Sequence, residues 1–266
     1  MKGEVATDLS TYTDRIKKNP KDARAFVGRG LAFIKMGRLD LALADFNHGL
    51  EIDPNVPGGH AGKAQTLLWQ GKDQEAIEEA STAIEQDDKD LSAWEVRAHA
   101  FLNSNQPQKA LDDLEEAAKV NSTQASVFEL QSQAYKKLKK DDEAVKASSK
   151  AIEIDPNFAQ SYNSRGIIYS KQGKNKEALA DFDKAAKLAP DVPDIYLNRA
   201  LSELALKQSD AALKDCNKAI DLSPGAGDAY YLRARIYREQ NNIKAAEDDE
   251  KSAVKFGYKP PKTLKF

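Results

Sequence analysis

The sequence is poor in the features that would place it outside the class of plain water-soluble folded proteins. Of its 266 residues, only Cys216 is a cysteine, so no disulfide can form within the chain. A lone thiol among apolar neighbours is typical of a small core residue. No apolar run approaches the roughly 20 residues that a membrane-spanning helix needs, so we expect no membrane insertion.

A surplus of basic residues is also missing. The 40 Lys and Arg residues stand against 42 Asp and Glu, which leaves a net charge of −2. Proteins that bind nucleic acid through its phosphates need a basic surface, and we therefore expect no nucleic-acid partner. The first residues lack the apolar stretch of a signal peptide, which favours a cytoplasmic protein. An exported protein whose leader has been removed is the alternative.

Catalytic and metal-binding motifs are absent as well. The three histidines, His48, His60 and His99, are widely separated, and none has the spacing of a metal site. His60 is expected to be a packed ring. There is no phosphate-binding glycine loop and no nucleophile motif. We therefore expect no metal, no cofactor and no enzymatic activity.

What the sequence does contain is a repeat of 34 residues. Prolines recur on this grid, and the residue 22 positions after the first of them is alanine in every period. A fixed period of this length is the mark of a stacked repeat architecture. The prolines are Pro20, Pro54, Pro156, Pro190 and Pro224, and the alanines are Ala42, Ala76, Ala110, Ala144, Ala178, Ala212 and Ala246.

Each period predicts two helices. Phe26, Gly30 and Phe33 follow the i, i+4, i+7 spacing of one helical stripe. A residue suited to left-handed backbone then ends the first helix, and the proline prevents the second helix from continuing. Large rings and small residues alternate, so two antiparallel helices can approach closely. The residues that end the first helix are Gly37, Gly71, Asn105, Gly173 and Asn241.

These small, aromatic and proline positions resemble those of the tetratricopeptide repeat family. The resemblance implies an all-α fold, a right-handed superhelical solenoid of about seven tandem helix–turn–helix repeats preceded by an N-terminal half-repeat helix. We expect one domain over residues 1–266. Its parts are a capping helix (1–22), the repeats 23–56, 57–90, 91–124, 125–158, 159–192, 193–226 and 227–258, and a C-terminal tail (259–266).

A basic and an acidic position recur in step. Arg165 on the first helix is followed sixteen residues later by Asp181, and four other periods repeat the pair. The second repeat has Lys63 and Glu79 instead, and the fourth loses both charges together. Positions that change together predict contact, so we expect a salt bridge at the seam between helices, within a repeat or to its neighbour. The other pairs are Arg29–Asp45, Arg97–Asp113, Arg199–Asp215 and Arg233–Asp249.

The family resemblance also implies a concave groove that is lined by the first helices and holds an extended peptide or a partner helix. A second stripe on these helices changes its chemistry from repeat to repeat, as expected of a specificity surface. It is apolar at first, acidic to mixed in the middle, and ends in an aromatic ring and two guanidinium groups. We expect the groove to include Asn163, Asn198, Leu201, Tyr231, Arg235 and Arg238.

Tyr and Arg are favoured interface anchors, so the C-terminal part of this stripe is expected to bind an acidic or polar peptide. The alternative is that both arginines are solvated or paired locally with Glu239 and Glu203. Some relatives bind chaperone tails through a clamp of Lys, Asn and Arg. This sequence has Val27 and Leu31 where that clamp needs polar groups, which disfavours such a partner.

The leading interpretation is therefore a non-enzymatic scaffold that binds a protein or peptide. The second interpretation is a self-assembling module, a homo-oligomer formed through exposed leucines or through the tail. The tail contains Tyr258, Pro260, Pro261 and Phe266. It is expected to cover the end of the stack, or else to act as a docking segment.

Overall fold

The computed structural model describes residues 2–259, which form fifteen α-helices and no strand. The all-helical prediction is confirmed. The helices are α1 (Lys2–Lys18), α2 (Ala23–Lys35), α3 (Leu39–Ile52), α4 (Gly59–Trp69), α5 (Asp73–Gln86), α6 (Leu91–Asn103), α7 (Pro107–Val120), α8 (Ala125–Lys137), α9 (Asp141–Ile154), α10 (Ala159–Lys171), α11 (Asn175–Leu188), α12 (Pro193–Ala205), α13 (Ser209–Leu222), α14 (Gly227–Glu239) and α15 (Ile243–Lys255).

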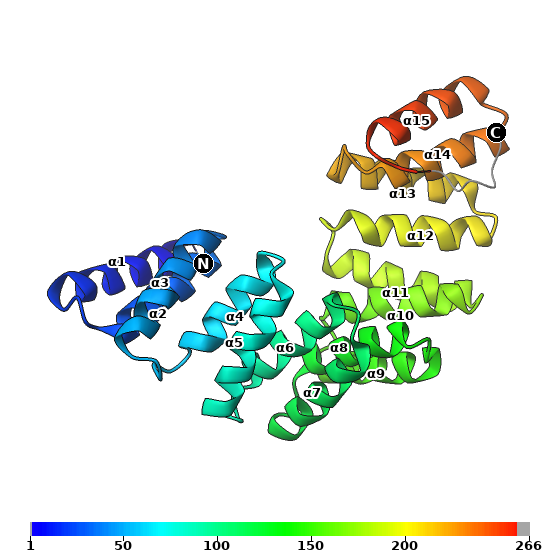
Figure 1. Ribbon diagram of the computed structural model, residues 1–266. Coiled ribbons are helices and arrows are strands. Elements are labelled where there is room, and N and C mark those ends of the chain that lie inside the picture. Colours follow the sequence, from blue (N-terminus) through cyan, green and yellow to red (C-terminus); the bar gives the residue numbers. More distant parts are fainter. Residues whose placement is uncertain (1, 260–266) are drawn as a thin grey trace. The chain divides into compact units, whose positions relative to one another are not determined.

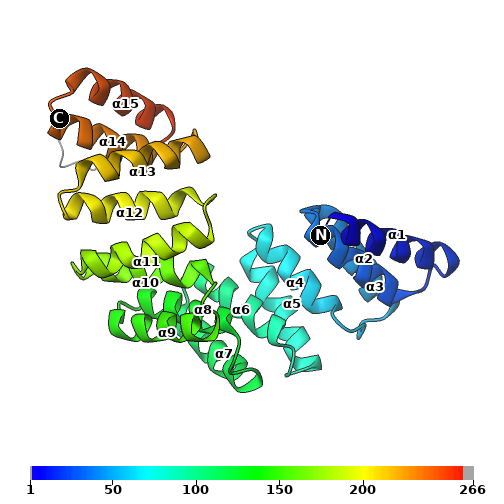
Figure 2. The same cartoon turned by 180° about the vertical axis from the view of Figure 1, so that it is seen from behind.

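The chain divides into two compact units, Met1–Lys140 with α1–α8 and Asp141–Phe266 with α9–α15. In the first unit each helix packs on the next one along the chain, and α4 also contacts α6. In the second unit the same order holds, and α12 lies between α11 and α13 in both views (Figures 1 and 2). The single domain over 1–266 and the right-handed superhelix stay predictions.

Helix boundaries follow the 34-residue grid. The second helix of every period begins on the grid, from Leu39 to Ile243, and so does the first helix of every period except one. The exception is α4, which begins two residues late at Gly59 because Pro57 and Gly58 come first. Gly58 caps this helix in a left-handed conformation, with φ of 76°.

Left-handed residues end the first helices, as predicted. Gly37, Gly71 and Gly173 have φ between 69° and 75°, and Asn105 and Asn241 have φ of 56° and 59°. The two remaining periods use lysines, which the sequence did not single out: Lys139 and Lys207, with φ of 59° and 61°. A lysine at positive φ is strained, because its Cβ crowds the backbone. The turn geometry is therefore imposed by the stack rather than by local preference at these two sites.

Small residues receive rings at the helix crossings. All seven grid alanines are fully buried. A Cβ added to Gly30 would lie 2.9 Å from Cζ of Phe46, and one added to Gly166 would lie 2.7 Å from Cε1 of Phe182. Both phenylalanines are completely buried. The predicted packing of rings against small residues is confirmed, and Cys216 is also a buried core residue.

The predicted ion pairs form within each repeat. In the fifth repeat the guanidinium of Arg165 donates to both carboxylate oxygens of Asp181, with each N–O distance 2.8 Å. The pairs at Arg29, Arg97, Arg199 and Arg233 have the same two-bond geometry. The hydrogen bonds to Asp181 raise the pKa of Arg165 above its ordinary value, against the opposing effect of burial.

Four of these arginines make a third bond, to the second helix of the preceding repeat. Arg165 donates through Nη1 to Oγ of Ser149, sixteen residues earlier, at 3.0 Å. Each arginine therefore joins three helices, which sets both the pairing inside a repeat and the register between repeats. The other bonds are Arg97–Ser81, Arg199–Asp183 and Arg233–Asn217.

Candidate functional site

The predicted groove residues of the second unit lie on α10, α12 and α14. Nδ2 of Asn198 donates to Oδ1 of Asn163 at 3.2 Å and joins the amides of two neighbouring repeats. Both residues are half-buried. A side-chain amide has two donor hydrogens and an acceptor oxygen with two lone pairs, so this one bond leaves hydrogen-bonding capacity for a ligand.

An apolar and a basic side chain accompany the amides. Leu201, one turn after Asn198 on α12, is 44% exposed. Arg235 occupies the equivalent position on α14, one period later, and is also exposed. Leu197 and Leu204, on the same stripe as Leu201, are partly buried against the core. Leu201 therefore stands out as an exposed large apolar residue on this stripe of the second unit.

Two of the six predicted residues are already engaged by the chain itself. Tyr231 is only 8% exposed, and its ring is stacked on that of Tyr258. Arg238 donates to both carboxylate oxygens of Glu250 on α15, at 2.6 and 2.8 Å. The sequence comparison of repeats missed both partners, because neither follows the 34-residue period of the groove stripe. Pro260, Pro261 and Phe266 of the tail lie outside the described residues.

The corresponding stripe of the first unit is apolar and then acidic. Leu31 on α2 is 41% exposed, whereas its stripe neighbours Val27 and Ile34 are buried. On α6, Glu95 accepts a hydrogen bond from Oγ of Ser126, and burial raises the pKa of this carboxyl above its ordinary value despite that bond. The first unit thus presents a different surface from the Asn and Arg residues of the second.

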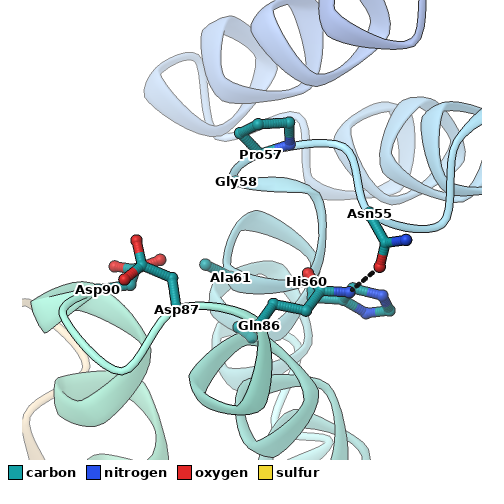
Figure 3. A pocket seen from close by; sticks show the side chains of 9 residues that line it. Asn55, Pro57, Gly58, His60, Ala61, Gln86, Asp87 and Asp90 are labelled. Carbon is teal, nitrogen blue, oxygen red and sulfur yellow. Dashed lines mark hydrogen bonds between the residues drawn. The ribbon is translucent and has the colours of Figure 1, made fainter.

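A small hollow of about 190 Å³ lies beside His60 in the first unit (Figure 3). Nε2 of Gln86 donates to Oδ1 of Asn55 at 3.1 Å across one side of it. The carboxylates of Asp87 and Asp90 line the other side. Oδ1 of each is already used by local backbone amides, at Lys89 for Asp87 and at Ser92 and Ala93 for Asp90, so the carboxylates serve as turn and helix caps.

His60 is a packed ring, as predicted, and it is also bonded on both sides. Its Nδ1 lies 2.6 Å from Oε2 of Glu79 and its Nε2 lies 3.2 Å from the carbonyl oxygen of Pro54. Both partners are acceptors, so a doubly protonated ring satisfies both. Burial alone would raise the pKa of Glu79, but hydrogen bonds from Lys63 and His60 lower it.

Glu203 is the most perturbed carboxyl of the second unit. It replaces the ring that Tyr169 contributes one period earlier, and it is 7% exposed. Burial raises its pKa to about 7, and the charge of Asp215 adds to the effect while that of Arg199 opposes it. Its Oε2 has no hydrogen-bond partner among the described residues.

Among residues 2–259, no group of three His, Cys, Asp or Glu side chains is arranged to hold a metal ion. Over the same range, no helix combines the length and the hydrophobicity needed to cross a bilayer.

Comparison with known families agrees with the helix grid. Models described as tetratricopeptide repeat match residues 23–56, 163–227 and 227–255, and a model described as TPR repeat matches residues 133–173. The chain belongs to the tetratricopeptide repeat family. Its buried alanines, left-handed turns and paired helices are therefore the family's repeat, and its specificity has to be sought in the residues that vary on the first helices.

Curated tetratricopeptide repeat relatives match a short part of the chain. The sequence is 33% identical over 67 residues to Hsp70-Hsp90 organizing protein 2 of Arabidopsis thaliana, which is 25% of this chain and 12% of that protein. It is 36% identical over 66 residues to U-box domain-containing protein 70 of Oryza sativa subsp. japonica, 25% of this chain and 8% of that protein. The matches thus span about a tenth of these relatives' length.

Solved structures show the same repeat fold over nearly the whole chain. A tetratricopeptide repeat protein from Parabacteroides merdae has a TM-score of 0.67 at 21% identity, over 90% of this chain and 94% of that one. The APC/C hetero-tetramer Cut9-Hcn1 has a TM-score of 0.79 at 15% identity, over 95% of this chain and 50% of that one. Human IFIT1, in a structure with m7Gppp-AAAA, has a TM-score of 0.74 at 18% identity, over 96% of this chain and 65% of that one. At these identities the likeness concerns the fold alone.

Tetratricopeptide repeat proteins are generally scaffolds for protein–protein interaction. For this chain the family assignment supports that general role. Which of its surfaces binds, and what it binds, depends on the residues described above.

Proposed function

We propose that the chain is a non-enzymatic scaffold whose second unit binds an extended acidic or polar peptide segment along α10, α12 and α14. The observation that carries the proposal is the amide pair of Asn163 and Asn198, bonded across two repeats beside the exposed Leu201 and Arg235. Partly accessible polar groups on a rigid helical surface, next to an exposed apolar side chain, suit peptide recognition.

Each group has a separate role in this proposal. The amides of Asn163 and Asn198 can donate to and accept from the main chain of a peptide, which gives affinity without dependence on its side chains. Leu201 supplies apolar contact area. Arg235 supplies a charge-assisted bond to a carboxylate of the peptide, and this bond selects for acidic segments.

Arg238 has a supporting role here. Its two bonds to Glu250 fix α15 against α14 and hold the end of the groove in place. An acidic ligand that approached Arg238 would have to compete with this ion pair. We therefore expect Arg235 to contribute more to binding than Arg238.

The thiol environment is consistent with a role other than catalysis. Cys216 is completely buried, and burial raises the pKa of its thiol to about 12. A thiol that stays protonated is a poor nucleophile. The remaining titratable groups of the second unit are mainly the paired Arg and Asp residues of the helix seams, which are occupied with one another.

The test starts from a synthetic library of twelve-residue peptides selected on the full chain. The affinity of a selected acidic peptide is then measured by fluorescence anisotropy for Asn198→Ala and Arg235→Ala. We expect each to weaken binding about tenfold, which corresponds to one lost charge-assisted or well-formed hydrogen bond. Lys187→Ala, an exposed residue of α11, is the matched control and should leave the affinity unchanged.

Unchanged affinity in both groove variants would refute the placement of the site. Selection of basic or purely apolar peptides that bind independently of Arg235 would refute the predicted ligand class. Added salt should weaken binding of the acidic peptide to the wild type more than to Arg235→Ala, because only the former contains the ion pair.

A further inference from the structure

The chain turns back on itself directly after α15. The amide of Gly257 donates to the carbonyl of Val254 at 3.0 Å, and the amide of Tyr258 donates to that of Ala253 at 2.9 Å. Gly257 has φ of 84°, a conformation that residues with a side chain rarely adopt. This helix cap fixes the backbone of Tyr258 and directs its side chain toward α14.

Two rings of this turn lie on two rings of α14. Phe256 is stacked on Tyr230, with centroids 5.5 Å apart and planes at 25°. Tyr258 is stacked on Tyr231, with centroids 4.4 Å apart and planes at 23°. Tyr230 belongs to the packed stripe of the first helices, whereas Tyr231 belongs to the groove stripe, one period after Leu197. Phe256 therefore covers the core, and Tyr258 covers the groove.

The turn and α14 are in very close contact at Gly227. A Cβ at this position would lie 2.9 Å from the carbonyl oxygen of Ala253 and 3.1 Å from Cβ of Tyr258. Glycine is thus required for Tyr258 to reach the face of Tyr231. A glycine at 227 and another at 257 are both used to bring one ring onto another.

Polar groups surround the stacked pair. Arg235 is close enough to favour the ionised form of Tyr258, whereas Asp228 disfavours it. Burial is the larger effect and leaves the pKa of the Tyr258 hydroxyl above its ordinary value. Tyr258 is itself only partly buried, so one face of its ring covers Tyr231 while the rest stays accessible.

We propose that the face of Tyr231, bordered by Gly227 and Arg235, is a binding site for an aromatic side chain of the partner peptide, and that Tyr258 fills this site in the free protein. The inference rests on the proposed function, since it names a subsite of the same groove. The partner is thereby specified as a peptide with a Tyr or Phe residue next to an acidic one, the ring for Tyr231 and the carboxylate for Arg235.

Exchange of the two rings needs little movement. The cap holds the backbone of residue 258, so a rotation about the side-chain bonds of Tyr258 is enough to uncover Tyr231. An incoming ring then stacks on Tyr231 as Tyr258 did, so one ring–ring interaction takes the place of another of the same kind. An attached ring competes at an effective concentration on the order of millimolar, and it should weaken but not prevent binding of an aromatic ligand.

The experiment uses the full chain and N-acetyl-tyrosinamide as the probe, followed by amide NMR shifts. Tyr258→Ala should bind the probe with saturable shifts at Gly227, Tyr231 and Arg235, at least fivefold more tightly than the wild type. N-acetyl-leucinamide, which has no ring, should give no saturable shift. Gly257→Val is a second variant: it disturbs the cap without removing any ring, and it should also bind the probe more tightly than the wild type.

Equal binding to wild type and Tyr258→Ala would overturn the proposal, because the probe would then occupy another place. Absence of binding to both variants, with helix content unchanged by circular dichroism, would overturn it as well. The outcome is separate from that of the peptide test above. Loss of the Asn198 and Arg235 effects with retained tyrosinamide binding would refute the proposed function alone, and the opposite result would refute the aromatic subsite alone.

Discussion

Replacement of Asp181 by alanine tests how much the three-helix contact of Arg165 stabilises the second unit. Asp181 is 6% exposed, and its removal leaves the guanidinium of Arg165 with Ser149 as its remaining hydrogen-bonded side chain. Breaking a fully buried pair typically costs about 3–5 kcal/mol, and breaking an exposed pair costs about 0–1 kcal/mol. The side chain of Arg165 is 20% exposed, so water can reach part of the charge. We therefore expect a loss of about 2–3 kcal/mol.

Urea unfolding followed by circular dichroism at 222 nm measures this loss, provided that the slope with urea is the same in all variants. Glu177→Ala, on the exposed face of the same helix, is the control and should change stability by less than about 0.5 kcal/mol. Replacing both partners, Arg165→Met with Asp181→Leu, should recover most of the loss, because no charge is then left unpaired. Equal and negligible effects of Asp181→Ala and Glu177→Ala would refute the reasoning.

Three further measurements follow from individual residues. Glu203 keeps its proton up to about pH 7 in the folded chain but releases it near its ordinary 4.5 when unfolded. Wild-type stability should therefore fall as pH rises between these values, by roughly 3 kcal/mol at most, and Glu203→Gln should remove that slope in urea titrations at pH 5 and 8. Lys207→Gly should raise the unfolding free energy by about 0.5–1 kcal/mol by relieving the positive φ, whereas Lys214→Gly inside α13 should lower it by about 1 kcal/mol. Light scattering should give the same mass at two concentrations; a mass that rises with concentration and returns to one chain in Leu201→Glu would instead favour self-assembly.

Period and residue size made the fold predictable from the sequence. Ala110 and Ala178 had to be small because a ring or a helix backbone faces them, and both are fully buried. The seam bonds were predictable because Arg165 and Asp181 vary in step with their counterparts. The left-handed conformation of Lys207 was not predictable, since lysine has no local preference for it and the surrounding stack imposes it.

The third bond of each arginine was missed, although a signal existed. The residue sixteen positions before each of these arginines is short and polar: Ser81, Ser149, Asp183 or Asn217. These residues differ in type, and a search for one recurring residue overlooks them. Their common property is a short acceptor at a fixed distance along the chain.

The groove was harder to predict than the fold, because its contacts do not repeat. Glu250 stands where Phe46 and Phe182 stand in other repeats, and it was expected to face water as part of a polar cap. It is half-buried instead and bonded to Arg238. Tyr258 lies beyond the last repeat, and no periodic comparison connects it with Tyr231. Contacts that occur once in the chain have to be seen in three dimensions.

The spacing of the arginine bonds has a consequence for how such a chain can change its length. Each of these arginines takes its partners from sixteen residues on either side. A duplicate of residues 159–192 spliced in after Val192 would give the new arginine an aspartate inside the duplicate and Asp183 behind it. Copying or losing whole 34-residue blocks therefore leaves no guanidinium stranded, whereas a break in mid-block would, so this fold can grow or shrink only by complete units.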